Sequence, residues 1–249
     1  MELRILPVRG IGEVKPGDDL AGAILAAIEQ QGEALAERDI VVVTQKIVSK
    51  AEGQMVDPAT IEPSAFAHEI ARQARKDAHH QEVVLRQSRR IVRMDRGVLI
   101  TETKHGLICA NAGVDESNVG GGHLLTLLPE DSDASAAGLR SAFAERAGAD
   151  VAVIISDTWG RPWRTGQVNF AIGVAGMNPL QDYIGKHDPY GYELHVSLIA
   201  VADELASAAE LVMGKIDRVP VAIIRGYEYT PAEGSASSLI RDAASDLFR

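Results

Sequence analysis

Apolar runs alternate along the chain with polar, glycine-containing segments, and this pattern predicts a mixture of strands and helices. Leu3 to Val8 alternates between apolar and polar residues as a half-buried strand does. Ile40 to Thr44 and Val151 to Ser156 are continuous apolar runs, which is typical of strands buried on both faces. We expect two further strands, over Glu193 to Ala202 and Val219 to Ile224.

Helix start signals precede most of the remaining apolar stretches. An aspartate or serine before a periodic run is a typical N-cap, and a proline is well tolerated in a first turn. Arg89 to Thr103 instead indicates a hairpin, with Arg96-Gly97 at its turn. The helices predicted in this way cover Leu20 to Ala36 after Asp18 or Asp19, Pro63 to Arg75, Ser132 to Ala147 with Asp131 or Ser132 as its cap, Asp203 to Met213, and Ser235 to Leu247.

The order of these elements favours the α+β class. Strands and helices follow one another without a steady βαβ rhythm, so a doubly wound parallel sheet is disfavoured. No proline- or serine-rich linker divides the chain, and a single domain over residues 1–249 is expected, with room for two α+β subdomains of unmarked boundary.

Charge and composition narrow the functional classes. The chain has 25 basic and 35 acidic residues and a formal net charge of −10, which argues against a nucleic-acid partner. Neither a signal peptide nor an apolar run of about 20 residues is recognisable, so we expect a cytoplasmic protein without a membrane partner. Cys109, the only cysteine, lies in an apolar run and is expected to be an inert core thiol.

Two aspartates stand where a metal ion could bind. Asp157 follows a predicted strand and precedes Thr158, and Asp115 lies in a glycine-rich loop with Asn118 three residues later. Magnesium prefers oxygen ligands and is often held by one or two carboxylates together with nucleotide phosphates. The alternative is purely structural: Asp157 caps a turn and Asp115 is a solvated loop residue.

Lysines follow the strand that ends at Thr44. Lys46 and Lys50 are four residues apart, so they would share one face of a helical turn. Two ammonium groups on one face favour an anion between them, such as a nucleotide phosphate, although an exposed basic turn is an equal alternative. Neither a Walker P-loop nor a Rossmann glycine motif occurs in the chain.

A third group of charged residues follows Asp157. Arg161 and Arg164 flank Trp163, and guanidinium groups suit the recognition of carboxylates and phosphates. In a chain of negative net charge, this local concentration predicts a contact to an anionic substrate.

Several motifs carrying these residues occur in order along nearly the whole chain. They are Pro16-Gly17-Asp18-Asp19-Leu20, Lys46 to Gly53, Asn111 to Val119, Ser156 to Arg161, Asp188-Pro189-Tyr190-Gly191, Ala202-Asp203-Glu204 and Arg225-Gly226. In these motifs the chain resembles the coenzyme F420 gamma-glutamyl ligase family, in its standalone form without a nitroreductase-like extension.

The resemblance implies a family-specific α+β fold of two intertwined parts, unlike a Rossmann or P-loop sheet, and a homodimer with sites near the subunit interface. It implies GTP-dependent attachment of L-glutamate to coenzyme F420-0, followed by glutamates joined through γ-carboxylates. The substrate carboxylate would be activated as an acyl phosphate.

The resemblance also implies roles for individual residues. Catalysis would rest on Asp115, Asp157 and Lys50, with two Mn²⁺ or Mg²⁺ ions on Asp115, Asp157 and Thr158 and K⁺ as a further candidate ion. Arg161 and Arg164 are assigned to the anionic tail of the acceptor from their position in the chain alone. The GTP contacts would be Ile11, Gly12, Glu13, Val14, Gln45, Lys46, Lys50 and Asn118.

One position departs from the family pattern. Some relatives place an acidic metal-binding residue directly after Met-Gly, where this chain has Lys215. Either a second metal ion is held differently here or Lys215 supplies charge to a phosphate. Two rival functions remain: a related nucleotide-dependent amide ligase acting on another carboxylate acceptor, and a non-catalytic GTP-binding module.

Overall fold

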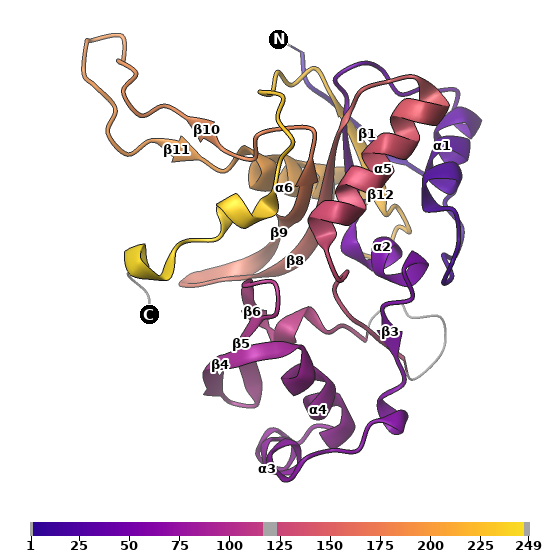
Figure 1. Cartoon of the computed structure of the whole chain (residues 1–249), viewed down its shortest axis with the longest axis vertical. Coiled ribbons are helices and arrows are strands. Elements are labelled where there is room, and N and C mark those ends of the chain that lie inside the picture. The colour runs from indigo at the N-terminus through magenta and orange to yellow at the C-terminus, as the bar shows by residue number, and fades with distance from the viewer. Residues whose placement is uncertain (1, 117–123, 247–249) are drawn as a thin grey trace.

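The computed structural model describes residues 2–116 and 124–246. It shows a main sheet with helices on both faces and a smaller lobe below it (Figure 1). Asn118 and the glycines at positions 120–122, which belong to the glycine-rich sequence that follows Asp115, lie outside the described residues.

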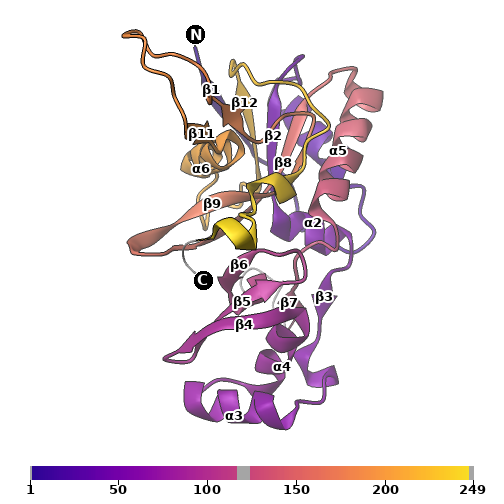
Figure 2. The same ribbon diagram turned by 60° about the vertical axis from the view of Figure 1, so that its left-hand side comes forward.

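The main sheet has five strands in the order β1-β12-β2-β8-β9. The two central strands, β2 (Ile40–Thr44) and β8 (Ala152–Arg161), are parallel, with Ile40 opposite Ala152 and Thr44 opposite Ser156. The other neighbours are antiparallel: β1 (Arg4–Val8), β12 (Val221–Arg225) and β9 (Arg164–Ala175). Because β2 and β8 run in the same direction, both carboxyl ends point to the edge that faces the small lobe (Figures 1 and 2).

Alternating side chains of the central strands face two separate cores. Val41 and Val43 pack in one apolar cluster with helices α1 (Leu20–Gln30), α2 (Gln45–Ala51) and α5 (Ser132–Ala147). Ile40 and Val42 face the opposite cluster, which is covered by α6 (Val201–Met213). This arrangement confirms the prediction that the Ile40–Thr44 strand is buried on both faces.

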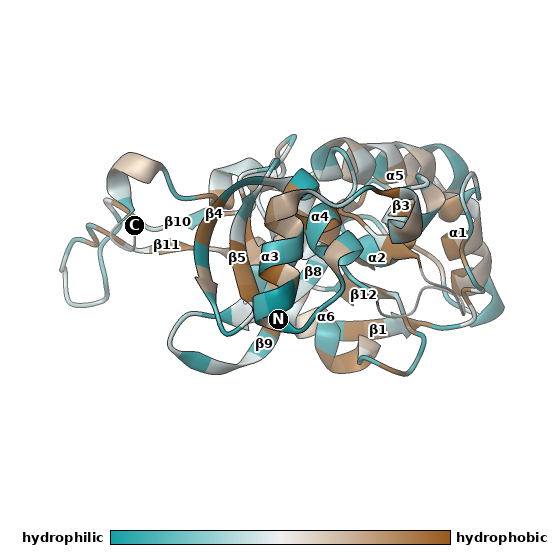
Figure 3. Ribbon diagram, turned by 90° about the horizontal axis from the view of Figure 1, so that it is seen from below, coloured by the Kyte–Doolittle hydropathy of each residue, from teal (hydrophilic) through white to brown (hydrophobic). Residues whose placement is uncertain are grey.

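The small lobe spans residues 55–116 and 124–126 and is inserted between α2 and α5. It has its own apolar cluster around Ile70, Val83 and Leu99. Figure 3 views this lobe from below, with both hydrophilic and hydrophobic colours along α3. Its elements are β3 (Met55–Val56), a 3₁₀ turn (Pro58–Thr60), α3 (Ala65–Ala74), α4 (Ala78–Gln87), β4 (Ser88–Asp95), β5 (Val98–Thr103), β6 (Ile108–Ala110), a second 3₁₀ turn (Asn111–Gly113) and β7 (Leu125–Thr126).

Two extensions project away from the main sheet in Figure 1. The β8–β9 hairpin continues past the end of β2, and an arm carries the short strands β10 (Gln181–Asp182) and β11 (Leu198–Ile199). The arm ends in a loop with Tyr190 at 96% exposure and an exposed Tyr192.

The α+β class and most predicted elements are confirmed, and the described chain contains no Rossmann or P-loop arrangement. The predicted Leu20 to Ala36 helix ends early, at Gln30, and the Pro63 to Arg75 helix begins at Ala65, with Ser64 rather than proline at its start. The helix α4 was not expected.

Cys109 is buried, and desolvation raises the pKa of its thiol to about 12. This agrees with the prediction of an inert core thiol.

Three predictions were wrong for identifiable reasons. The Glu193 to Ala202 strand forms only over Leu198–Ile199, because the arm offers no longer partner strand. Over the described residues 235–246, the predicted Ser235 to Leu247 helix is replaced by two 3₁₀ turns, Ala236–Leu239 and Ala243–Ser245, since Ser235 and Asp242 bond to the nearby backbone; Leu247 lies outside the described residues.

The third error concerns β8, which does not end at Ser156 but continues to Arg161 alongside the unpredicted strand β9. Glycines weaken the strand pattern of β9. Gly173 is required by packing, since a Cβ there would lie 2.2 Å from the carbonyl oxygen of Ser132 at the start of α5.

Between residues 2–116 and 124–246 the structure has no helix that combines the length and apolar character needed to cross a membrane. The cytoplasmic location therefore stays a prediction.

An ion pair joins the start of β2 to the end of β12, at the edge of the main sheet opposite the small lobe. The Arg225 guanidinium donates to both carboxylate oxygens of Asp39, at 2.8 and 2.7 Å, and to the carbonyl oxygen of Ala34. Asp39 is 1% exposed and directly precedes β2. The hydrogen bonds to Asp39 raise the pKa of the Arg225 guanidinium.

We expect Asp39→Ala to lower the free energy of unfolding by about 3 kcal/mol, because it leaves the Arg225 charge without its buried partner. Urea unfolding followed by circular dichroism measures this change. The matched control is Glu69→Ala, which removes an exposed ion pair with Arg72 and should cost less than about 1 kcal/mol. Equal losses of unfolding free energy in the two variants would contradict a stabilising role for the buried Asp39–Arg225 ion pair.

Candidate functional site

Helix α2 begins directly where β2 ends, and it carries the predicted lysines. Lys46 and Lys50 lie on this helix, as their spacing predicted. Gln45 and Ser49 are buried beside them, with the Ser49 hydroxyl donating to Gln45 Oε1 at 2.8 Å. The short helix thus fixes both lysines at the edge of the sheet that faces the small lobe.

Each lysine has a carboxylate of the chain beside it. Lys46 Nζ lies 2.7 Å from Asp115 Oδ2, and Lys50 Nζ lies 2.5 Å from Glu13 Oε1. The Lys50 side chain is only 6% exposed, whereas that of Glu13 is 60% exposed. The pairs place Asp115 and the loop of residues 11–14 next to α2, so these predicted site residues are brought together.

Asp115 belongs to the small lobe, and its backbone is fixed by two hydrogen bonds with Thr126. Asp115 N donates to Thr126 O at 3.1 Å, and Thr126 N donates to Asp115 O at 2.9 Å. The Lys46–Asp115 pair therefore joins the small lobe to the main sheet.

Asp157 lies in β8, one residue beyond the point where its pairing with β2 ends. Desolvation raises the pKa of its carboxyl from 3.8 to about 6, and the neighbouring charge of Asp115 adds to the rise. A hydrogen bond from Thr158 N, at 2.8 Å, and the charges of Lys215 and Lys46 act in the opposite direction. Asp157 and Asp115 thus interact within one group that includes Lys46.

The donor set of this group fits a divalent ion bound with a nucleotide. In the part of the chain that the structure describes, no three or more Asp, Glu, His or Cys side chains gather as a complete metal site. Two carboxylates, however, match the way Mg²⁺ is held when phosphates and water supply its other ligands. A cation would also compensate the partly buried charge of Asp157.

Thr158, the third predicted metal ligand, is already engaged on both sides. Its hydroxyl accepts from Lys215 Nζ at 2.7 Å and donates to Asn169 Oδ1 at 2.6 Å. Asn169 in turn donates to Glu210 Oε2 at 3.1 Å. Sequence reasoning missed Asn169 and Glu210. The sequence does place Asn169 between the apolar residues Val168 and Phe170. This position could have indicated a buried polar side chain.

Arg161 and Arg164 are not joined to this group in the structure. They face each other near the tip of the β8–β9 hairpin, four residues along the strand from Asp157, or about 13 Å. The Arg161 guanidinium donates to the carbonyl oxygen of Thr165, and Trp163 at the tip is 81% exposed. Their assignment to an anionic substrate stays a prediction.

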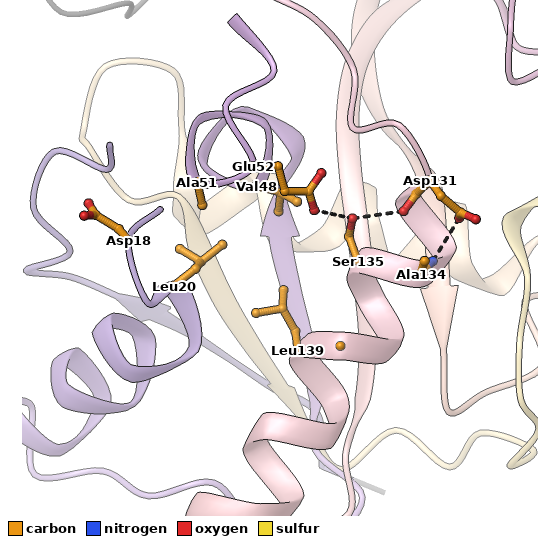
Figure 4. A pocket seen from close by; sticks show the side chains of 10 residues that line it. Asp18, Leu20, Val48, Ala51, Glu52, Asp131, Ala134, Ser135 and Leu139 are labelled. Atoms are coloured by element: carbon orange, nitrogen blue, oxygen red, sulfur yellow. Dashed lines mark hydrogen bonds between the residues drawn. The ribbon is translucent and has the colours of Figure 1, made fainter. Parts of the chain in front are cut away.

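A depression of about 520 Å³ lies nearby, between α1, α2 and α5 (Figure 4). Its polar walls include the carboxylates of Asp18, Glu52 and Asp131, and Glu52 accepts a hydrogen bond from Ser135 at 2.5 Å. Its lining contains no lysine or arginine. This surface would repel an anionic nucleotide, so the Lys46–Asp157 group is the better candidate for a phosphate site.

Comparisons with known proteins agree with the motifs. The family model described as F420-0:Gamma-glutamyl ligase matches residues 10–226. A coenzyme F420:L-glutamate ligase of Methanothermobacter thermautotrophicus is 45% identical over 252 residues, covering 100% of both chains. Proteins of the same name from Methanopyrus kandleri and Archaeoglobus fulgidus are 46% and 40% identical, covering 99% and 100% of this chain and 98% and 97% of their own length.

We expect Asp157→Asn to stabilise the metal-free protein at pH 7.5 by about 2–3 kcal/mol, or roughly 5–10 °C in Tm. A raised carboxyl pKa means that the folded state binds a proton more tightly than the unfolded chain does. The protonated carboxyl therefore favours folding below pH 4, and this advantage is lost as the pH rises through about 6.

Thermal unfolding in EDTA across pH 4 to 7.5 measures the effect. The difference between wild type and Asp157→Asn should shrink below pH 6 and nearly vanish at pH 4. The exposed Asp95→Asn is the matched control and should show no such trend. A wild type as stable as Asp157→Asn at pH 7.5 would contradict a desolvated carboxylate at this position.

Proposed function

The chain belongs to the F420-0:gamma-glutamyl ligase family, and from this premise we propose that it joins L-glutamate to coenzyme F420-0 in a GTP-dependent reaction. The observation that carries this proposal is the meeting of Asp115 and Asp157 beside Lys46. Partly desolvated carboxylates next to lysines suit a phosphoryl-transfer site, where charge neutralisation and positioning do most of the work.

We assign GTP to the surface formed by α2 and the loop after β1. Lys46 and Lys50 would bind phosphate oxygens, releasing part of their present contact with Asp115 and Glu13. Gln45 and the loop residues Ile11, Gly12 and Val14 would support the nucleotide. The contact assigned to Asn118 lies outside the described residues.

Asp115 and Asp157 would hold a divalent ion, Mn²⁺ or Mg²⁺, with GTP. Bound there, the ion would neutralise charge on the phosphates and draw the two carboxylates together. K⁺ as a further ion is part of the proposal.

The proposed chemistry has two balanced steps. A carboxylate oxygen of the acceptor forms a bond to the γ-phosphorus of GTP, the bond from that phosphorus to the β–γ bridging oxygen breaks, and GDP leaves. The glutamate amine then attacks the acyl carbon, phosphate leaves with its bonding electron pair, and the amine loses a proton to solvent. Lys46 and Lys50 stabilise the negative charge that moves between the phosphate oxygens in the first step.

We also propose a homodimer and a cytoplasmic location. The arm between β10 and β11 exposes Tyr190, Tyr192 and Val196, and the hairpin tip exposes Trp163. Large apolar side chains on projecting segments are typical of surfaces that a partner covers. A second copy of the chain is the partner proposed here.

Mass spectrometry of the product tests the proposed reaction. Wild-type protein incubated with F420-0, GTP, Mn²⁺ and L-glutamate should increase the acceptor mass by one or more glutamate residues. Asp157→Asn and Lys46→Ala should each lower kcat at least about 100-fold, because the first weakens the binding of the proposed divalent ion and the second removes positive charge beside the phosphates. The control is Glu69→Ala. Glu69 lies on α3, away from the proposed site, and this variant should retain full activity.

Two other outcomes would contradict the proposal. Turnover of GTP only with a different carboxylate acceptor would identify a related amide ligase. Binding of GTP and metal without glutamate-dependent phosphate release would identify a non-catalytic nucleotide-binding module.

A further inference from the structure

Lys215 lies near the group of Asp115 and Asp157, where its charge lowers the pKa of the Asp157 carboxyl, and its side chain contacts the next residue of β8, Thr158. It follows Gly214, which ends α6 with a φ of +61°. This left-handed conformation favours glycine and lets the chain turn back toward β8. The side chain then donates to the Thr158 hydroxyl at 2.7 Å.

A network behind Thr158 fixes the direction of its hydroxyl. Because the proton of Thr158 is donated to Asn169 Oδ1 at 2.6 Å, its oxygen faces Lys215 as an acceptor. Asn169 is buried, and its amide donates to Glu210 at 3.1 Å. Ser207, one turn earlier on α6, donates to the backbone oxygen of Asn169 at 2.8 Å. Three hydrogen bonds thus orient the Thr158 hydroxyl oxygen toward Lys215.

Asp157 and Thr158 are adjacent in a strand, so their side chains leave opposite faces. Asp157 belongs to the group with Lys46 and Asp115, whereas Thr158 faces α6 through Asn169 and Lys215. The Lys215 charge next to Thr158 also acts on Asp157, so the two positions are close enough to interact. On the α6 face, the ammonium of Lys215 already fills the position beside the hydroxyl.

We propose that Lys215 supplies the positive charge at Thr158 in place of a divalent ion, so that this chain binds one divalent ion per nucleotide site, on Asp115 and Asp157. The inference rests on the proposed function for the nucleotide itself. An ammonium group and a divalent ion repel each other at one position, and the ammonium of Lys215 lies 2.7 Å from the Thr158 hydroxyl oxygen. The Lys215 charge also stays in place at any metal concentration.

Counting bound Mn²⁺ by equilibrium dialysis with saturating GDP tests the proposal. Wild type should bind one Mn²⁺ per chain. Lys215→Glu replaces the ammonium with a carboxylate at the hydroxyl of Thr158, and it should raise the number from one to two. Lys215→Met removes the charge without adding a ligand and should keep the number at one.

Thermal unfolding establishes that each variant is folded before ions are counted. Two ions on the wild type, or one ion on folded Lys215→Glu, would overturn the proposal. If Lys215→Glu does not fold, the wild-type count alone decides between one ion and two.

The count also separates this inference from the proposed function. A wild type that forms the glutamylated product with two ions refutes only the role of Lys215. A wild type that binds no Mn²⁺ with GDP and forms no product refutes the proposed function as well.

Discussion

A carboxylate held partly away from water needs positive charge beside it, and Asp157 is held in this way. Desolvation raises its pKa to about 6, so at neutral pH the folded chain carries a charge that it would hold more easily when unfolded. Groups of this kind are concentrated at functional sites, where a ligand supplies the missing interaction. The lysines around Asp157 and the divalent ion proposed to bind it both stabilise its negative charge.

The topology of the main sheet creates this environment. The parallel pairing of β2 and β8 ends at Thr44 and Ser156, and α2 starts immediately after β2, so Lys46 lies near the part of β8 that continues beyond the pairing. The small lobe is inserted after α2 and returns Asp115 to this edge through its bridge to Thr126. Because Lys46 pairs with Asp115, the contact that joins the lobe to the sheet is also part of the site.

Sequence reasoning succeeded where a local pattern has one physical meaning. Continuous β-branched residues can be buried on both faces, and the spacing of Lys46 and Lys50 places them together once a helix forms. It failed where long-range pairing decides the structure. The hairpin with β9 extends β8, so Asp157 became a strand residue, and Arg161, close to it in sequence, lies far along an extended chain.

The location of the site is tested most directly by anomalous scattering from crystals of the wild-type protein grown with GDP and Mn²⁺. The account predicts a manganese peak within bonding distance of both Asp115 and Asp157, with the GDP phosphates against Lys46 and Lys50. A manganese peak remote from Asp157, such as one among Asp18, Glu52 and Asp131, would contradict it.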